Sequence, residues 1–268
     1  INAEESGLLI ACEEDLYTRY QQAQTQWLEI LRGGGEISPA MAAALDKVIG
    51  RAMQNPQALD VVLRIPDVIY CQETVGGFDF DALCDAHEKL GLELAKRWEL
   101  EWVELFKATS GRLDARYTWS PEQAAFRRVR AIALKQLVRA DQKYICLAEA
   151  LYREADNISD QMAALSALIC RDSHKVEILL EDFYHKAKDH DLQLDRWFWL
   201  QAGRHSTDPL ANLQNLLAHD ACDWRRPNRI MTTFAGWLSQ HSQNLHATSG
   251  QGYDALASAI IRLDGLNP

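Results

Sequence analysis

Apolar residues recur at three- and four-residue spacing along nearly all of this 268-residue chain, and the alternating runs that form strands are scarce. A repeat of this period places apolar side chains on one face of an α-helix. Residues 15–32 give one example, in which Tyr20, Trp27 and Ile30 share a stripe. This segment ends at glycines 33–35, which have poor helix propensity. The pattern therefore predicts an all-α fold.

Polar caps, prolines and glycines divide the chain into successive helices, with loops predicted at about 66–77 and 111–119. We expect helices at about 15–32, 39–55, 57–64, 79–109, 120–140, 141–156, 159–170, 174–188, 195–202, 209–218, 229–240 and 253–263. Successive amphipathic helices without a long heptad seam favour an irregular α-solenoid of antiparallel helix pairs, of the armadillo/HEAT kind. A compact bundle is the alternative, because no strict sequence period is visible.

The charge and hydropathy of the chain disfavour several partners. With 38 acidic and 28 basic residues, the formal net charge is -10. Nucleic acids and anionic membranes are bound by clustered Lys and Arg, so we expect neither as a partner. No apolar run approaches the roughly 18 to 20 residues of a membrane span, and a basic stretch followed by an apolar one is missing at the N-terminus. We therefore expect a cytoplasmic location.

The six cysteines, at positions 12, 71, 84, 146, 170 and 222, form no Cys-x-x-Cys pair. Several, such as Cys146, lie in apolar helical segments, which predicts small buried thiols in a reducing compartment. Disulfide bonds are the alternative, since the number is even. They are disfavoured because the chain is much larger than the small scaffolds that depend on them.

Candidate chemistry is sparse in this sequence. Glu181, His185 and Asp189 are four residues apart and could hold a divalent metal from one helix face, although an ordinary solvated face has the same spacing. His87 and Glu88 begin the zinc-peptidase motif His-Glu-x-x-His, but position 91 is glycine. Gly-rich phosphate loops, a Gly-x-Ser-x-Gly elbow and a convincing Cys-His pair are also missing. We predict no catalytic residue, metal ligand or cofactor within this chain, and we interpret the aromatic residues 197–199 as core.

Six strings follow one another in a specific order along the chain: 15–24, 121–130, 155–166, 194–202, 226–230 and 250–253. Together they resemble the C-terminal helical domain of bacterial aminopeptidase N, a zinc metallopeptidase of the gluzincin group. The resemblance covers essentially the whole chain. Its structural motif residues are Arg127, Arg130, Asn157, Asp160, Asp195, Trp197 and Tyr253.

Local physical roles support these strings independently. Asn157 or Ser159 can accept a backbone N–H at a helix start, and Asp195 can do the same before the aromatic helix. Gly250 and Gly252 permit a tight turn into the last helix.

The resemblance implies an enzyme whose zinc site and Gly-x-Met-Glu-Asn stretch lie in an upstream catalytic domain. Neither is in this sequence. In that family the C-terminal helices form a curved cap over the catalytic cleft, and the cap admits peptides while it excludes folded proteins. We therefore expect residues 1–268 to be a single C-terminal helical cap domain, a fragment of a larger enzyme that is inactive alone. The expected partners are the upstream domain and peptide substrates, with zinc bound only in the catalytic domain that is absent from this chain.

The family pattern Asn-Pro-Asn-Arg-x-Arg directs its second arginine toward the substrate chamber. Here the string from Arg226 to Met231 has Asn228 and Arg229 in place, but Met231 stands where that second arginine would be. We expect Asn228, Arg229 and Met231 to face the chamber. A thioether cannot pair with a carboxylate, so the contact of Met231 would be apolar and adaptable. Family members continue past the position of Pro268, which suggests a truncated chain or a short member.

Two rival hypotheses remain. The chain could be a free-standing α-solenoid that binds a protein or peptide on a concave face. It could also be a metal-binding helical protein centred on Glu181, His185 and Asp189.

Overall fold

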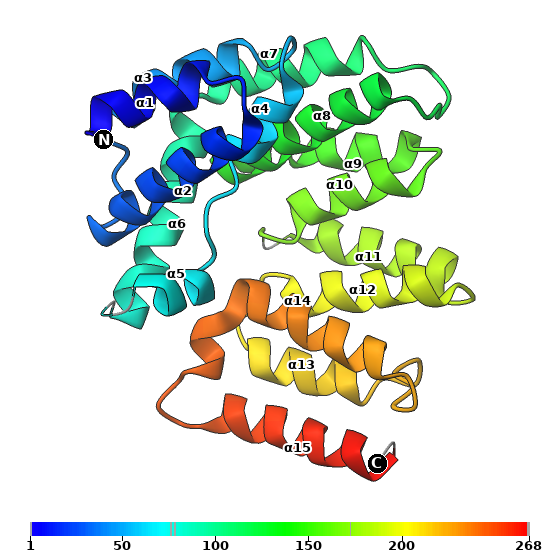
Figure 1. Ribbon diagram of the computed structural model, residues 1–268. Coiled ribbons are helices and arrows are strands. Elements are labelled where there is room, and N and C mark those ends of the chain that lie inside the picture. The colour runs from blue at the N-terminus through cyan, green and yellow to red at the C-terminus, as the bar shows by residue number, and fades with distance from the viewer. Residues whose placement is uncertain (1, 76, 78, 172, 267–268) are drawn as a thin grey trace. The chain divides into compact units, whose positions relative to one another are not determined.

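The computed structural model describes residues 2–75, 77, 79–171 and 173–266, and within them every regular element is helical (Figure 1). This confirms the predicted all-α fold. The chain divides into two compact units, residues 1–164 and 165–268. No helix in the described ranges is both long and apolar enough to cross a bilayer.

The first unit contains the helices up to α9 and most of α10. Their bounds are α1 (Ala3–Cys12), α2 (Leu16–Arg32), α3 (Pro39–Gly50), α4 (Pro56–Val62), α5 (Val68–Val75), α6 (Phe80–Arg97), α7 (Glu99–Ser110), α8 (Pro121–Ala140), the 3-10 helix η1 (Gln142–Tyr144), α9 (Ile145–Glu154) and α10 (Ile158–Leu168). Three begin as predicted, because the side chains of Asp15, Ser38 and Ser120 each accept a backbone N–H at the helix start.

The core of the first unit forms where α1 to α4 and α6 to α8 pack together. Trp27 of α2 is completely buried, and its indole Nε1 donates to the carbonyl of Val62 across 2.7 Å. This bond fixes α2 against α4. Gly35 has φ +83°, and any side chain there would collide with the backbone of Ala86, so α6 approaches closely because residue 35 is glycine.

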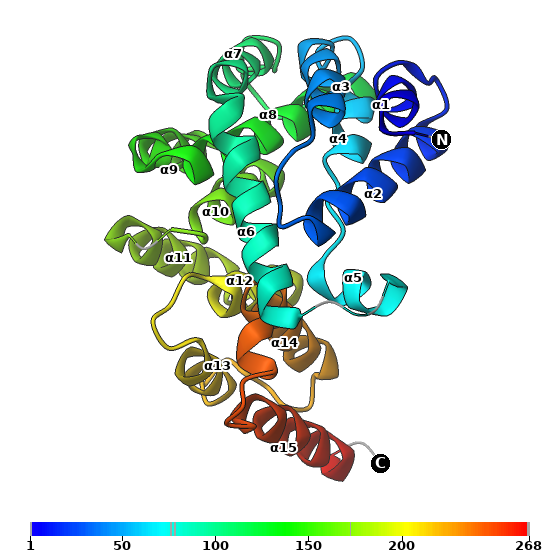
Figure 2. The same cartoon turned by 90° about the vertical axis from the view of Figure 1, so that its left-hand side faces the viewer.

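The predicted helix 79–109 is two helices, α6 and α7, which Figure 2 shows running in different directions. The break is at Trp98, whose φ of -112° and ψ of 30° are not helical. Its indole donates to Asp46 of α3 across 2.7 Å. The Leu94 carbonyl, which Trp98 would have bonded in a continuous helix, instead accepts the indole N–H of Trp102 at 3.1 Å. A contact distant in sequence therefore sets the kink.

The second unit contains α11 (His174–Ala187), α12 (Asp191–Gly203), α13 (Pro209–Leu217), α14 (Pro227–Leu245) and α15 (Gln251–Leu266). Its centre is the pair α12 and α14. These two helices run in the same direction, because Arg229 contacts Asp195 near their starts and His241 contacts the Arg204 carbonyl near their ends. Between them Gly236 lies against the backbone of Trp199, so small residues let the helices approach closely.

Four further elements differ from the predicted secondary structure. Helices α1 and α5 occupy segments where none was expected, and α5 starts where Asp67 accepts the N–H of Tyr70 at 2.7 Å. Helix α12 begins at residue 191 rather than 195, so Asp195 is not its cap. Helix α14 continues to residue 245 through a non-helical kink at His241.

Candidate functional site

The start of α14 contains the residues that the sequence singled out. Pro227 occupies the first turn, where its fixed φ suits a helix and its missing N–H costs nothing. The turn points neighbouring side chains in different directions. Arg229 has only 3% of its surface exposed, whereas Asn228 is exposed and Met231 is 65% exposed. The chamber-facing role of these three residues stays a prediction.

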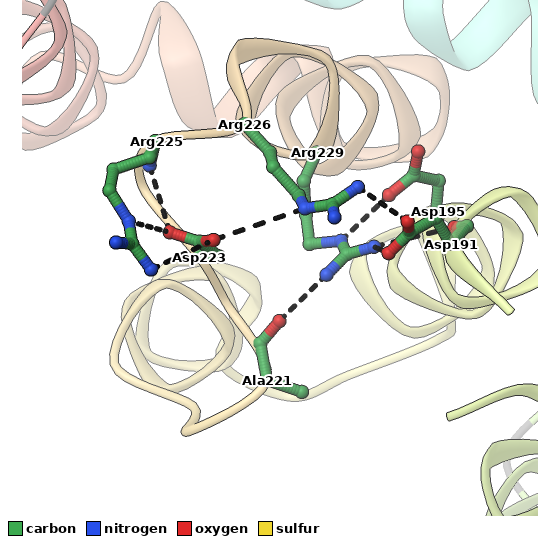
Figure 3. Close-up of polar contacts among 7 residues, drawn as sticks. All are labelled: Asp191, Asp195, Ala221, Asp223, Arg225, Arg226 and Arg229. Carbon is green, nitrogen blue, oxygen red and sulfur yellow. Dashed lines mark hydrogen bonds and ion pairs between the residues drawn. The ribbon is translucent and has the colours of Figure 1, made fainter. Parts of the chain in front are cut away.

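Arg229 joins α14 to α12 and to the loop before α14 (Figure 3). Its Nε donates to Oδ1 of Asp195 across 2.7 Å, and one terminal nitrogen donates to the carbonyl of Ala221 at 3.0 Å. The other terminal nitrogen contacts the carbonyl and carboxylate of Asp191 at 3.3 and 3.4 Å. The guanidinium carbon also lies 5.6 Å from the ring centre of Phe198. A buried arginine is tolerated when it is paired and hydrogen-bonded in this way.

Two further arginines complete this group, which we call the α12–α14 clamp and which Figure 3 draws. It consists of Asp191, Asp195, the Ala221 carbonyl, Asp223, Arg225, Arg226 and Arg229. Arg226 approaches Asp191 at 2.6 Å, and Arg225 approaches Asp223 at 3.1 Å. The side chain and backbone N–H of Arg225 hold the pKa of Asp223 below its ordinary value. Every guanidinium of the clamp has a carboxylate partner, so the clamp stabilises the helix arrangement rather than presenting an unpaired charge.

The first unit brings together four other motif residues. Arg130 contacts Asp160 at 2.6 Å, and Arg127 lies 3.6 Å from the same carboxylate. Asn157 accepts the backbone N–H of Asp160 at 2.9 Å and donates to its carboxylate at 2.7 Å. Asn157 is therefore the cap that the sequence predicted at the start of α10. Because Arg127 also stacks 4.5 Å above the ring of Tyr117, this cluster joins α8 and α10 to the loop 111–120.

The remaining motif residues have structural positions as well. Trp197 is 6% exposed and donates its indole N–H to the Leu180 carbonyl at 2.8 Å, which confirms its predicted core position. Tyr253 is half exposed, and its hydroxyl lies 2.6 Å from Nδ1 of His246. Gly250 has φ +72°, and a side chain on Gly252 would lie 2.6 Å from the Asn244 carbonyl. The predicted tight turn into α15 is confirmed.

The metal hypothesis for Glu181, His185 and Asp189 is wrong. Helix α11 ends at Ala187, so Asp189 does not share its face, and all three side chains are exposed. Across the described ranges, no group of three His, Cys, Asp or Glu side chains could hold a metal ion. The residues that the structure describes therefore do not fit a zinc ion.

The cysteine prediction holds in part. None of the six cysteines, all of which lie in the described ranges, forms a disulfide bond, and Cys71 and Cys222 are buried. Burial raises the pKa of each of these two thiols to about 11. Cys12 and Cys146 are exposed, so the interpretation of Cys146 as a buried apolar residue is wrong.

The chain matches the family model described as "Domain of unknown function (DUF3458_C) ARM repeats" over residues 3–268. It belongs to this ARM-repeat family. The predicted armadillo-like fold is thus confirmed, and the clamp and the Asp160 cluster are contacts between helices of such repeats.

Curated relatives of this ARM-repeat chain are aminopeptidases N. The protein of Haemophilus influenzae (strain Rd) is 29% identical over 87% of the chain, and that of Escherichia coli K12 is 26% identical over 93%. The Caulobacter vibrioides protein is 24% identical over 97%. The chain spans between 26% and 31% of the length of these relatives and corresponds to their C-terminal part.

A solved structure shows the same fold. The crystal structure of Legionella pneumophila aminopeptidase A in complex with aspartic acid matches 100% of the chain and 33% of that protein. The TM-score is 0.87 and the sequence identity is 23%.

Proposed function

We propose that this chain is the C-terminal helical part of a zinc aminopeptidase, and that it caps the catalytic cleft and limits access to peptides. The observation that carries the proposal is the match of residues 3–268 to an ARM-repeat family, together with three aminopeptidases N that align over most of the chain. A cytoplasmic location stays a prediction within the same proposal.

The residues of the chain indicate which task belongs to which domain of the proposed enzyme. Since the described residues offer no group that fits a metal, zinc would be bound by the catalytic domain upstream in the same polypeptide. The helices of this chain would form a wall around the catalytic cleft. A wall that surrounds a cleft excludes water and folded proteins, and it admits extended peptides without any added chemistry.

The start of α14 is the part of the chain that we assign to the chamber wall. Arg229 is held by Asp195 and the Ala221 carbonyl, which fixes the first turn of α14. Asn228 and Met231 project from that fixed turn, and both are exposed in this chain. A fixed turn with exposed side chains can position substrate contacts at little cost in conformational entropy.

The access role can be tested with the complete enzyme that contains this chain. We expect kcat/KM to remain high for peptides of a few residues and to fall sharply for a folded protein with the same N-terminal sequence. The control is the same protein unfolded by reduction and carboxymethylation, which should be cleaved again. Equal rates on the folded and unfolded forms would refute an access role.

Reading the coding sequence upstream of Ile1 separates the proposal from the free-standing solenoid. An in-frame His-Glu-x-x-His followed by a downstream Glu supports the aminopeptidase, because these residues form the zinc site and supply its general base. A native start codon at this point would favour an independent binding module.

A further inference from the structure

A groove of about 620 Å³ lies in the second unit between α13 and α15. Its walls carry the polar side chains of Gln214, Gln251 and Ser258, and small residues such as Ala211 and Ala255 leave space between the helices. The clamp residues do not line it. The groove is therefore separate from the site described above.

The positive end of the groove is built by Trp224 and Arg262. The indole N–H of Trp224 donates to the Leu217 carbonyl at 3.1 Å, which fixes the ring at the C-terminal end of α13. The guanidinium carbon of Arg262 lies 3.9 Å from the centre of that ring. Stacking on a fixed indole limits the rotamers of Arg262 and orients its N–H groups before any ligand arrives.

The negative end of the groove is formed by two carboxylates. Asp208 caps α13 by accepting the N–H of Ala211 at 2.9 Å, and Asp254 lies in the first turn of α15. Among the residues that the structure describes, neither Asp254 nor Arg262 has a partner in an ion pair. This distinguishes Arg262 from Arg229, whose charge is fully paired.

The spacing of these ends selects a ligand length. Asp254 and Arg262 are eight residues apart on α15, which corresponds to about 12 Å along the helix axis. An extended peptide advances about 3.3 Å per residue, so about four residues span this distance. The hydroxyl of Ser258 lies between Asp254 and Arg262 on α15, and the amides of Gln214 and Gln251 also line the groove. All three groups can bond a peptide backbone.

We propose that this groove binds short extended peptides with free termini. The ammonium group lies at Asp208 and Asp254, and the carboxylate lies at Arg262. The chemistry that recognises the ligand is the separation of its two terminal charges rather than its side chains. An acid at the start of a helix and a base at its end also stabilise the helix itself, so the test has to measure binding.

The test titrates the 268-residue chain with tetra-alanine, at up to about 10 mM because contacts this exposed give weak affinity, and follows amide shifts by NMR. We expect saturable binding, with the largest shifts at residues that line the groove. Acetylation of the amino end and amidation of the carboxyl end should each weaken binding about two- to fivefold, the range for exposed ion pairs. No saturation, or equal affinity of blocked and free peptides, would overturn the proposal.

Variants assign each end. In Arg262→Gln, amidation of the peptide should no longer weaken binding, whereas acetylation still should. In Asp254→Asn, acetylation should no longer weaken binding, whereas amidation still should. Asp264→Asn on the same helix and Arg196→Gln on α12 are matched controls outside the groove, and they should keep both penalties. If the groove variants behave like these controls, the assignment is wrong. The experiment measures binding to this chain alone. The groove proposal can therefore fail while the cap proposal stands, and the cap proposal can fail while the groove proposal stands.

Discussion

Arg229 donates to Asp195 across 2.7 Å and thereby ties the start of α14 to α12, two helices that run in the same direction. Because Arg229 is almost fully buried, loss of its partner Asp195 should destabilise the folded chain. Asp195→Ala should lower the free energy of unfolding by about 2–4 kcal/mol, since a buried charge loses its partner. Arg225→Gln, at a side chain 83% exposed, should cost under about 1 kcal/mol. Urea unfolding followed by circular dichroism measures both, and equal costs would contradict the account.

Gly236 tests the close approach of α12 and α14. A β-carbon at this position would collide with the backbone of Trp199, so Gly236→Ala should destabilise the second unit by about 1–3 kcal/mol. Gly265→Ala in α15 is the control. No atom lies within 4 Å of its added carbon, and it should be neutral or stabilising by up to about 1 kcal/mol. Thermal unfolding distinguishes the two, and a stabilising Gly236→Ala would rule out the tight contact.

His241 predicts a loss of stability in acid. Burial is the main reason that its pKa lies below the ordinary value, and nearby His205 lowers it further. In the unfolded chain His241 takes up a proton near pH 6.5, whereas the folded chain resists protonation. Stability is therefore present above about pH 6.5 and falls as the pH drops toward the folded-state pKa.

Urea midpoints measured between about pH 7.5 and 5.5 test this titration. His241→Gln should flatten the decline, because Gln can still donate to the Arg204 carbonyl but does not titrate in this range. His87 has a pKa shifted in the same direction, also mainly by burial, and should keep a part of the slope. If the urea midpoint of His241→Gln falls with pH as steeply as that of the native chain, His241 is not a source of the decline in stability.

The thiols should react in an order set by burial. At pH 8 a thiol of pKa about 11, such as Cys71 or Cys222, is ionised to about one part in a thousand. Cys12 and Cys146 are exposed and should be alkylated first by iodoacetamide. Peptide mass spectrometry after timed quenching measures the order, and early labelling of Cys222 would contradict the packing around it.

Met231 tests the proposed chamber wall. In the complete enzyme, Met231→Arg would place a guanidinium on the exposed side of α14, and this should change KM or selectivity among peptides of different length. Leu192→Arg changes another exposed apolar residue of the same unit and serves as the control. Unchanged kinetics across all lengths would count against a chamber-facing Met231.

Local signals predicted much of this fold. Helices α2 and α8 start where Asp15 and Ser120 accept backbone N–H groups, and the run of glycines ends α2. The signal for α1 was also present, because Asn2 and Glu5 form a reciprocal capping box. An Asn followed three residues later by Glu is a local signal for a helix start that the sequence itself contains.

Contacts between distant residues could not be predicted in this way. The break at Trp98 depends on Asp46, which is 52 residues away, and the role of Asp195 depends on Arg229. A carboxylate before an aromatic helix has the same local pattern whether it caps that helix or pairs with another one. The groove between α13 and α15 likewise combines Trp224 with Arg262, which no local pattern connects.

The most direct test of the central claim compares the complete polypeptide with this chain alone, at equal molar concentration, for bound zinc and for release of an aminoacyl chromophore. The complete polypeptide should contain stoichiometric zinc and turn over the substrate, and residues 1–268 alone should do neither. Stoichiometric zinc and robust turnover by the isolated chain would contradict the claim that its helices cover a reaction centre supplied by another domain.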